Sequence, residues 1–258
     1  MMDAIQKKLL EQVADLHDVP QGAYSLRING NLYGKNDSEN ISIVKKEDQP
    51  GIDIYVKAGT KNESLHIPVI LSQSGLKELV YNDFHIGEDC DVTIVAGCGI
   101  HNSGCAPSKH SGIHTFHLAK NSRMRYVEKH YGDGDGSGEN VMNPTTIVVC
   151  EKNSYMEMET AQIKGVDSTR RVTTGKVMKN ATLIVQEKIM THGEQYARTG
   201  IQFMNFNTIY QLYDDKLNGR LDRATDMLMI PEYLMWKLSG VKAREYTHAQ
   251  YTTCFARS

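Results

Sequence analysis

The sequence predicts a mainly β protein whose chain winds into a flattened parallel β-helix, a form of β-solenoid. Two observations predict it: apolar residues alternate with period two from about Tyr24 onward, and a turn-and-strand block recurs along the chain. The 40% apolar residues and 21 glycines among 258 residues can bury a sizeable core. The net charge of −2 gives no reason to expect a nucleic-acid partner.

Residues 1–20 are expected to form an N-terminal helix ahead of the strands. Apolar residues from Ile5 to Leu16 return at helical spacing within residues 3–18, and Pro20 is expected to end the helix. Acidic residues interrupt this stretch, which is not typical of a targeting peptide. No uncharged apolar run approaches about 18 residues, so we expect no membrane partner and a cytoplasmic protein.

A repeated block places a polar turn before large apolar residues at the second and fourth following positions. Corresponding positions of the block are Cys90, Ser122, Ser154 and Ala181. The block therefore recurs every ~30 residues, a period typical of solenoids and propellers. A second strand, such as residues 113–118, lies between successive blocks. Two strands per repeat suit a parallel β-helix better than a propeller, whose blades usually need about 40 residues and four strands. An ordinary β-sandwich with chance similarity between strands is the alternative.

The β-helix is expected to fill residues 21–199 and to stop there. Residues 200–258 differ in composition, since they hold the only tryptophan, Trp236, and three of the five phenylalanines. We expect an atypical tail, which is either a helical cap or a segment outside the fold. The abrupt change also suggests the hypothesis that the reading frame shifts near Arg198.

The densest group of candidate ligands lies between residues 97 and 117. Cys98, His101 and Cys105 are followed by His110 and His114, and thiolate and imidazole are the ligands that suit zinc and iron–sulfur clusters. The spacing matches no standard zinc finger. The alternative is that Cys98 is a small buried hydrophobic residue and that the histidines are exposed loop residues.

A family resemblance rests on eight short runs spread over residues 20–199. These runs are Pro50–Ile54, Thr60–Ser64, His66–Val69, Gly97–Asn102, Gly112–Phe116, Tyr126–Gly132, Gln162–Ser168 and Thr191–Gln195. Together they resemble the SufB/SufD family of iron–sulfur cluster assembly proteins, and they look most like its short, single-core members. The resemblance implies a right-handed parallel β-helix, in agreement with the repeat.

The resemblance also implies a function, namely a scaffold on which iron–sulfur clusters are assembled, without turnover chemistry of its own. It implies a SufC-like ABC-type ATPase and a second SufB/SufD-type β-helix subunit as partners, in a homo- or heterodimer. Cys98, His101 and Cys105 lie in the stretch that matches the family's cysteine-rich segment, so the resemblance implies that they handle a transient cluster. Ser103 stands where cysteine is common in the family, so one thiolate is missing. His110 and His114 remain candidate metal ligands.

Two other functions are compatible with the residues. A carbohydrate-active β-helix enzyme would need a carboxylate cluster in an open groove. Glu128, Glu159 and Glu187 recur with the repeat, but we expect them to form an exposed ladder rather than an acid–base set. A structural metal-binding module would bind metal without sulfide. No glycine cluster is followed by Gly-Lys-Ser/Thr, so the chain is expected to have no P-loop ATPase of its own and to be no enzyme.

Overall fold

The structure is a computed structural model that describes residues 2–191, 196–203, 219 and 230–242. The chain divides into two compact units, Met1–Gln202 and Phe203–Ser258. The first contains helix α1 (Ala4–Ala14) and a β-solenoid, whereas helix α3 (Ile230–Ser239) lies in the second. Most of the predicted tail, and therefore the hypothesis of a shifted reading frame, lies outside the described residues.

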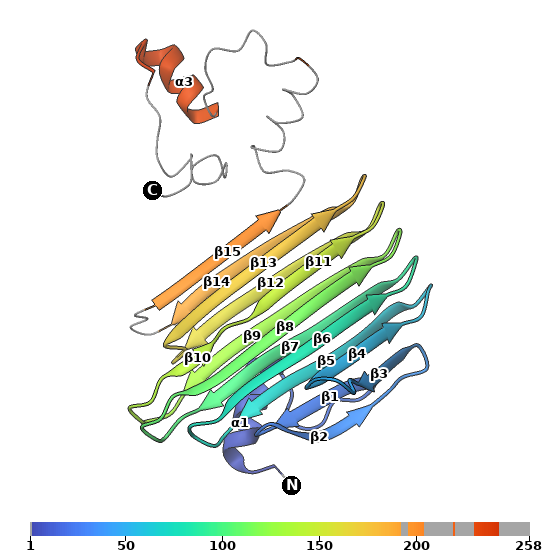
Figure 1. Cartoon of the computed structure of the whole chain (residues 1–258), viewed down its shortest axis with the longest axis vertical. Coiled ribbons are helices and arrows are strands. Elements are labelled where there is room, and N and C mark those ends of the chain that lie inside the picture. The colour runs from blue at the N-terminus through green and yellow to red at the C-terminus, as the bar shows by residue number, and fades with distance from the viewer. Residues whose placement is uncertain (1, 192–195, 204–218, 220–229, 243–258) are drawn as a thin grey trace. The chain divides into compact units, whose positions relative to one another are not determined.

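Two sheets run along the solenoid, and Figure 1 shows their strands stacked one above the other from the N-terminal end upward. The first sheet has the order β14 (Thr182–Thr191), β12 (Tyr155–Lys164), β9 (Arg123–Asp133), β7 (Asp91–His101), β5 (Lys61–Leu71), β1 (Ala23–Ile28) and β2 (Asn31–Asn36). The second has the order β10 (Asn140–Met142), β13 (Ser168–Val177), β11 (Thr145–Cys150), β8 (Ser108–Leu118), β6 (Lys77–Ile86), β4 (Gly51–Val56) and β3 (Ile41–Lys45). Strand β15 (Tyr196–Phe203) pairs with β13.

The strand register confirms the β-solenoid that the repeat predicted. In the first sheet, Val92 pairs in parallel with Met124, Met124 with Met156, and Met156 with Leu183. These partners occupy successive repeats of the block, so the spacing read from the sequence is the length of a single coil. Because each coil exposes its apolar face until the next one stacks on it, the coils bury their apolar side chains together, and among the described residues the main cluster runs from Ala23 to Met158.

The turns explain why asparagine recurs in the repeat. Asp89, Asn121, Asn153 and Asn180 all adopt left-handed backbone conformations, with φ between 55° and 60°. Asparagine and aspartate tolerate this region better than other residues with a side chain. Their side chains also form a ladder, in which the Asn121 amide donates to Asp89 at 3.1 Å and the Asn153 amide donates to Asn121 at 3.0 Å. The polar turn is thus a structural requirement of stacked coils.

Helix α1 is shorter than the residues 3–18 that the periodicity predicted. Asp3 caps its start in a capping box with Gln6, and Asp15 ends it by adopting a left-handed conformation with φ of 54°. Pro20 therefore plays no part in ending it. The helix packs on the outer face of the first sheet, where Leu9 is fully buried and a Cβ added at Gly99 would lie 3.0 Å from the Leu9 Cβ.

The interior of the solenoid is divided into an apolar part and a polar part. Phe84 and Phe116 stack at 4.4 Å between ring centroids in the apolar part. In the polar part, Glu128 is 3% exposed and Arg171 is 1% exposed, and the two side chains form an ion pair. The predicted exposed ladder of glutamates is therefore wrong for Glu128, and also for Glu187, whose side chain is 12% exposed and lies 3.0 Å from Arg171. The neighbour of Glu128 in register is Thr160 rather than Glu159, so the alternation of the strand turns Glu128 inward and Glu159 outward.

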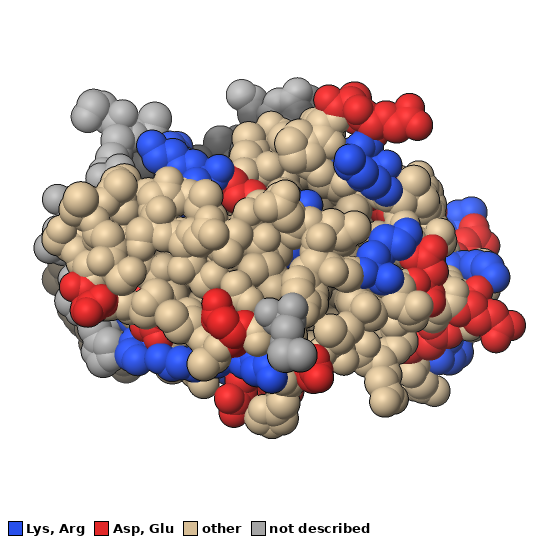
Figure 2. Space-filling model, turned by 90° about the horizontal axis from the view of Figure 1, so that it is seen from below, with Lys and Arg blue, Asp and Glu red and all other residues tan. Residues whose placement is uncertain are grey.

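The surface carries charges of both signs. Viewed from the N-terminal end of the solenoid, Lys and Arg side chains alternate with Asp and Glu around a largely uncharged area (Figure 2). No helix within the described residues is long and apolar enough to cross a membrane.

Candidate functional site

The five predicted ligands come from β7, from the loop that follows it and from β8, and the fold sends them in different directions. Cys98 and His101 lie on β7, Cys105 lies in the loop, and His110 and His114 lie on β8. Among the described residues there is no group of three or more His, Cys, Asp or Glu side chains arranged to hold a metal ion. The structure therefore does not bring these five side chains together.

The two cysteines have different surroundings. Cys98 is 1% exposed and points into the solenoid, whereas Cys105 is exposed. Burial raises the pKa of the Cys98 thiol well above its usual value, and the nearby carboxylates of Glu78 and Glu128 raise it further. A thiol with a raised pKa is a poor nucleophile and a poor metal ligand, because both roles need the thiolate.

The two histidines of β8 have partners inside the fold. His110 Nδ1 lies 3.2 Å from a carboxylate oxygen of Glu78. His114 Nδ1 lies 2.8 Å from the Tyr126 hydroxyl, and its Nε2 lies 3.3 Å from the Asn82 amide. Burial lowers the pKa of His114 to about 4, so its imidazole is neutral at pH 7. With both nitrogens occupied, His114 belongs to the core hydrogen-bond network.

This core network continues from Tyr126 to the buried ion pair. The Tyr126 hydroxyl donates to Glu128 at 2.9 Å, and the guanidinium of Arg171 pairs with the same carboxylate. Burial works to raise the pKa of Glu128, but the charges of Arg171 and His130 outweigh burial and hold this pKa well below its usual value. Perturbed pKa values often mark functional sites, but structural ion pairs perturb them as well. Since this network is enclosed by the coils, we assign it a structural role.

His101 is the one predicted residue that lies in an open groove with other reactive groups. Its Nδ1 lies 2.7 Å from Asp133 at the end of the neighbouring strand β9, and Lys8 from α1 donates to the same carboxylate at 2.6 Å. Burial works to raise the pKa of Asp133, but the hydrogen bonds from Lys8 and His101 outweigh it and lower the pKa. The Tyr131 hydroxyl lies 3.3 Å from Asp133 and accepts a hydrogen bond from Lys164 at 3.1 Å.

We call this feature the Asp133 groove. Its volume is about 580 Å³, and it is lined by Lys8, His101, Gly132, Asp133, Gly134, Asp135, Lys164 and Gly165. Asp133 engages Nδ1 of His101, so Nε2 is the ring nitrogen that remains for a ligand. A carboxylate that holds an imidazole by one nitrogen prepares the other nitrogen to accept a proton. Lys8 and Lys164 are suited to binding an anionic group beside it.

Sequence reasoning missed most of the Asp133 groove. Lys8 and Asp133 are 125 residues apart, and Lys164 comes from yet another strand. No spacing along the chain links Lys8 to the other two residues, whereas Lys164 pairs in register with Gly132, one coil length earlier. The signal that could have been used is the coil length, because His101 and Asp133 are 32 residues apart and therefore lie side by side in register.

The comparisons with known proteins show a short similarity to sugar kinases. Over 59 residues, or 22% of this chain, the sequence is 49% identical to the rhamnulokinase of Mannheimia succiniciproducens and covers 12% of that protein. Over the same length, it is 49% identical to the rhamnulokinase of Oceanobacillus iheyensis and 51% identical to that of Halalkalibacterium halodurans. It covers 13% of each of these two proteins. The chain thus spans about an eighth of the length of these curated relatives. No protein-family model and no solved structure matches the chain.

These findings overturn the predicted SufB/SufD membership and the function drawn from it. The relatives are named as rhamnulokinases, so neither the iron–sulfur scaffold nor the carbohydrate-active β-helix enzyme is supported, and the prediction that the chain is no enzyme is wrong as well. The predicted β-solenoid itself is confirmed. The transient cluster, the SufC-like ATPase and the second β-helix subunit rested on the resemblance, and they stay predictions that no observation tests.

The structure gives a physical reason why the eight short sequence runs resembled the SufB/SufD family. Several of their residues serve the geometry of a stacked coil. Gly132 and Gly165 let two successive coils approach closely, since a Cβ added at Gly132 would lie 2.2 Å from the Gly165 carbonyl oxygen, and the Asn102 amide donates to the carbonyl of Ala106 at 3.0 Å. Residues that any coil of this shape needs will recur in unrelated solenoids. Their recurrence therefore carries information about fold rather than about activity.

Proposed function

We propose that this chain takes part in the phosphorylation of a ketose sugar, and that rhamnulose is the first substrate to test. The observation that carries the proposal is the 49–51% identity to rhamnulokinases over 59 residues. Because this segment corresponds to only 12–13% of a relative's length, it supplies part of a kinase site at most. We place the remaining groups elsewhere in this chain.

We infer that the kinase-like segment is the tail. Residues 200–258 number 59 (258 − 199 = 59), which equals the length of the shared segment. The composition also changes there, and the second compact unit begins at Phe203. A tail translated in a shifted frame would not resemble a protein family at this level of identity. If the kinase-like segment is residues 200–258, this segment is translated in the correct reading frame and is joined to a solenoid, contrary to the frameshift hypothesis.

Within the described residues, the Asp133 groove offers a base and two cationic side chains, which are among the groups that phosphoryl transfer uses. His101, held by Asp133, would accept the proton of the attacking sugar hydroxyl at Nε2. Lys8 and Lys164 would bind the phosphoryl group as it moves from the nucleotide to the sugar oxygen. The four described cysteines, Cys90, Cys98, Cys105 and Cys150, are free thiols, as is usual in the reducing cytoplasm, so a cytoplasmic location is part of the proposal.

The test is rhamnulose-dependent release of ADP from MgATP by the full chain, with the sugar phosphate identified by mass spectrometry. We expect turnover with rhamnulose, and we expect His101→Gln to lower it by about 10²–10⁴-fold, the usual contribution of a general base. His17→Gln is the matched control, because His17 is an exposed histidine near the end of α1. If the folded chain releases no ADP in response to the sugar, the proposed function is wrong. If it does so and His101→Gln is fully active, the function stands and the placement in the Asp133 groove is wrong.

A further inference from the structure

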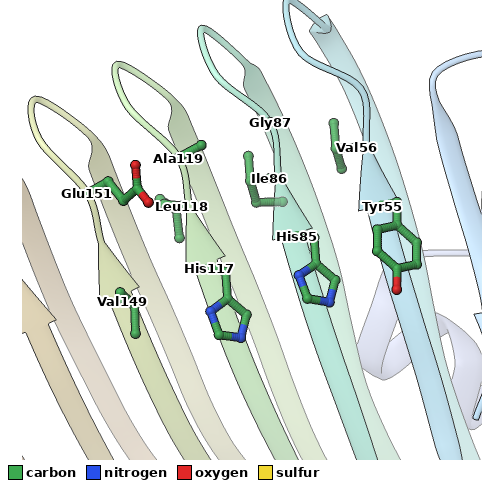
Figure 3. A pocket seen from close by; sticks show the side chains of 10 residues that line it. All are labelled: Tyr55, Val56, His85, Ile86, Gly87, His117, Leu118, Ala119, Val149 and Glu151. Carbon is green, nitrogen blue, oxygen red and sulfur yellow. The ribbon is translucent and has the colours of Figure 1, made fainter.

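A second pocket lies on the outer face of the second sheet, away from the groups assigned above. It has a volume of about 330 Å³, and its walls include Tyr55, His85, His117, Val149 and Glu151. Figure 3 shows the rings of Tyr55, His85 and His117 projecting in the same direction from neighbouring strands. We call these three side chains the ring row.

The register of the strands creates the ring row. Tyr55 of β4 pairs with His85 of β6, His85 pairs with His117 of β8, and all three strands are parallel. The rings of Tyr55 and His85 are 4.7 Å apart with an angle of 10° between their planes. Those of His85 and His117 are 5.1 Å apart with an angle of 4°. Since neighbouring strands lie about 4.7–4.9 Å apart, the rings extend side by side from equivalent positions.

The two imidazoles are the nitrogen ligands that this pocket offers a metal ion, and the carboxylate of Glu151 lies in its wall as well. Among the described residues, neither His85 nor His117 is held by a hydrogen bond, in contrast to His101, His110 and His114. Burial lowers the pKa of His85, and the neighbouring His117 lowers it further. A neutral imidazole is the form that acts as a ligand for zinc, copper and nickel.

We propose that His85 and His117 together bind one divalent transition-metal ion of the Zn²⁺, Ni²⁺ or Cu²⁺ class at the outer face of the solenoid. Metal–nitrogen bonds are about 2.0–2.1 Å long, so the two nitrogens must come within about 4 Å of each other. The ring centroids of His85 and His117 are 5.1 Å apart and their planes are nearly parallel, so their in-plane nitrogen lone pairs do not yet converge on one point. Because His117 is exposed, its ring is free to rotate about the side-chain bonds, which turns a nitrogen toward His85 and brings the two nitrogens to this separation. Water completes the coordination, because the pocket is open to solvent.

The proposal is independent of sugar phosphorylation, since none of its residues belongs to the Asp133 groove. It also differs from the predicted metal ligands His110 and His114, whose side chains point into the solenoid from the same strand as His117. Alternation along β8 places His114 inside and His117 outside. The same periodicity that removes His114 from solvent therefore presents His117 to a ligand.

The experiment is calorimetric titration of the untagged full chain with NiCl2, accompanied by thermal unfolding with and without the ion. We expect one Ni²⁺ per chain at this site and a higher Tm in its presence, because an ion that binds only the folded state stabilises it. His85→Ala and His117→Ala should each weaken binding by at least about tenfold, since losing even an outer partner of a metal ligand costs about that much. Both residues face outward, and circular dichroism verifies that the variants fold.

Two controls separate this site from others. His17→Ala removes an exposed histidine far from the ring row in sequence, and Cys105→Ser removes the exposed thiol. Both should bind Ni²⁺ as the wild type does. The proposal is overturned if the folded wild type shows no saturable Ni²⁺ binding. It is also overturned if His117→Ala binds the ion as tightly as the wild type.

Discussion

Removing the charge of Glu128 should destabilise the solenoid far more than removing that of a glutamate on its surface. Glu128 is 3% exposed and pairs with Arg171, which is 1% exposed and whose Nε also lies 3.0 Å from Glu187. Glu128→Gln keeps the shape of the side chain but leaves a buried guanidinium short of one counter-charge. Breaking a buried ion pair in this way costs about 3–5 kcal/mol.

The matched control is Glu159→Gln on the neighbouring strand β12. Glu159 bridges Arg125 at 3.1 Å and Lys188 at 2.8 Å, but its side chain is 27% exposed. Such surface pairs contribute about 0–1 kcal/mol. For a unit of this size, 1 kcal/mol shifts Tm by about 2–4 °C, so Glu128→Gln should lower Tm by roughly 10 °C and Glu159→Gln by only a few degrees.

The assay is urea unfolding of the full chain followed by circular dichroism, together with thermal unfolding. Arg171→Met alone should also be strongly destabilising, because it leaves the carboxylate of Glu128 buried without its counter-charge. The double variant should cost less than the sum of the two single changes, since the two partners are in direct contact. If Glu128→Gln and Glu159→Gln lowered the free energy of unfolding equally, the reasoning would be refuted, because burial would then have no effect on how much an ion pair stabilises the fold.

Three further predictions follow from single positions. The pKa of His114 is lowered to about 4 in the folded state, from 6.5 in the unfolded chain. The unfolding free energy therefore contains about 3 kcal/mol that is present above pH 6.5 and lost as the pH falls toward 4. His114→Gln should flatten this decline, as measured by urea unfolding across the same pH range. Gly136→Ala should lower the urea midpoint sharply, because the added Cβ would overlap the carbonyl of Gly104, and an unchanged midpoint would contradict this packing. Leu9→Ala should cost about 2–5 kcal/mol by chemical denaturation, whereas Ile5→Ala, at a position 39% exposed on the same helix, should cost much less.

Much of the fold could be predicted because it is local and periodic. The turn residues Asp89, Asn121 and Asn153 and the alternating strand residues repeat at one coil length, and this length is also the distance between partners in the sheet. The sequence of a solenoid in which each coil contacts its neighbours is therefore periodic, and the period can be recognised without a structure. The extent of α1 was not predicted, since a left-handed conformation at Asp15 ended the helix before the apolar pattern did.

The candidate site could be predicted only in part. His101 was identified by its residue type, but its chemistry depends on Asp133 and Lys8. Cys98 and Cys105, which were predicted to bind the same cluster as His101, do not lie with it in the groove. Residue type marks which side chains can act as ligands, whereas the direction of each side chain depends on the strand alternation and on the coil above or below. The same limit explains why Glu128 was placed on the surface.

The order of the amino acids is enough to specify how the coils stack, because the period of the repeated block sets both the length of a coil and the register between coils. The folded chain decided the contacts that the period does not specify: Lys8 reaches Asp133 because α1 lies across the outer face of the first sheet. The pairs His101–Asp133 and His85–His117 are each one coil length apart, but their contacts depend also on which way each side chain faces. The physical reason is that a repeat fixes equivalent positions along the chain, whereas a site depends on which unlike residues those positions bring within hydrogen-bonding or coordination distance.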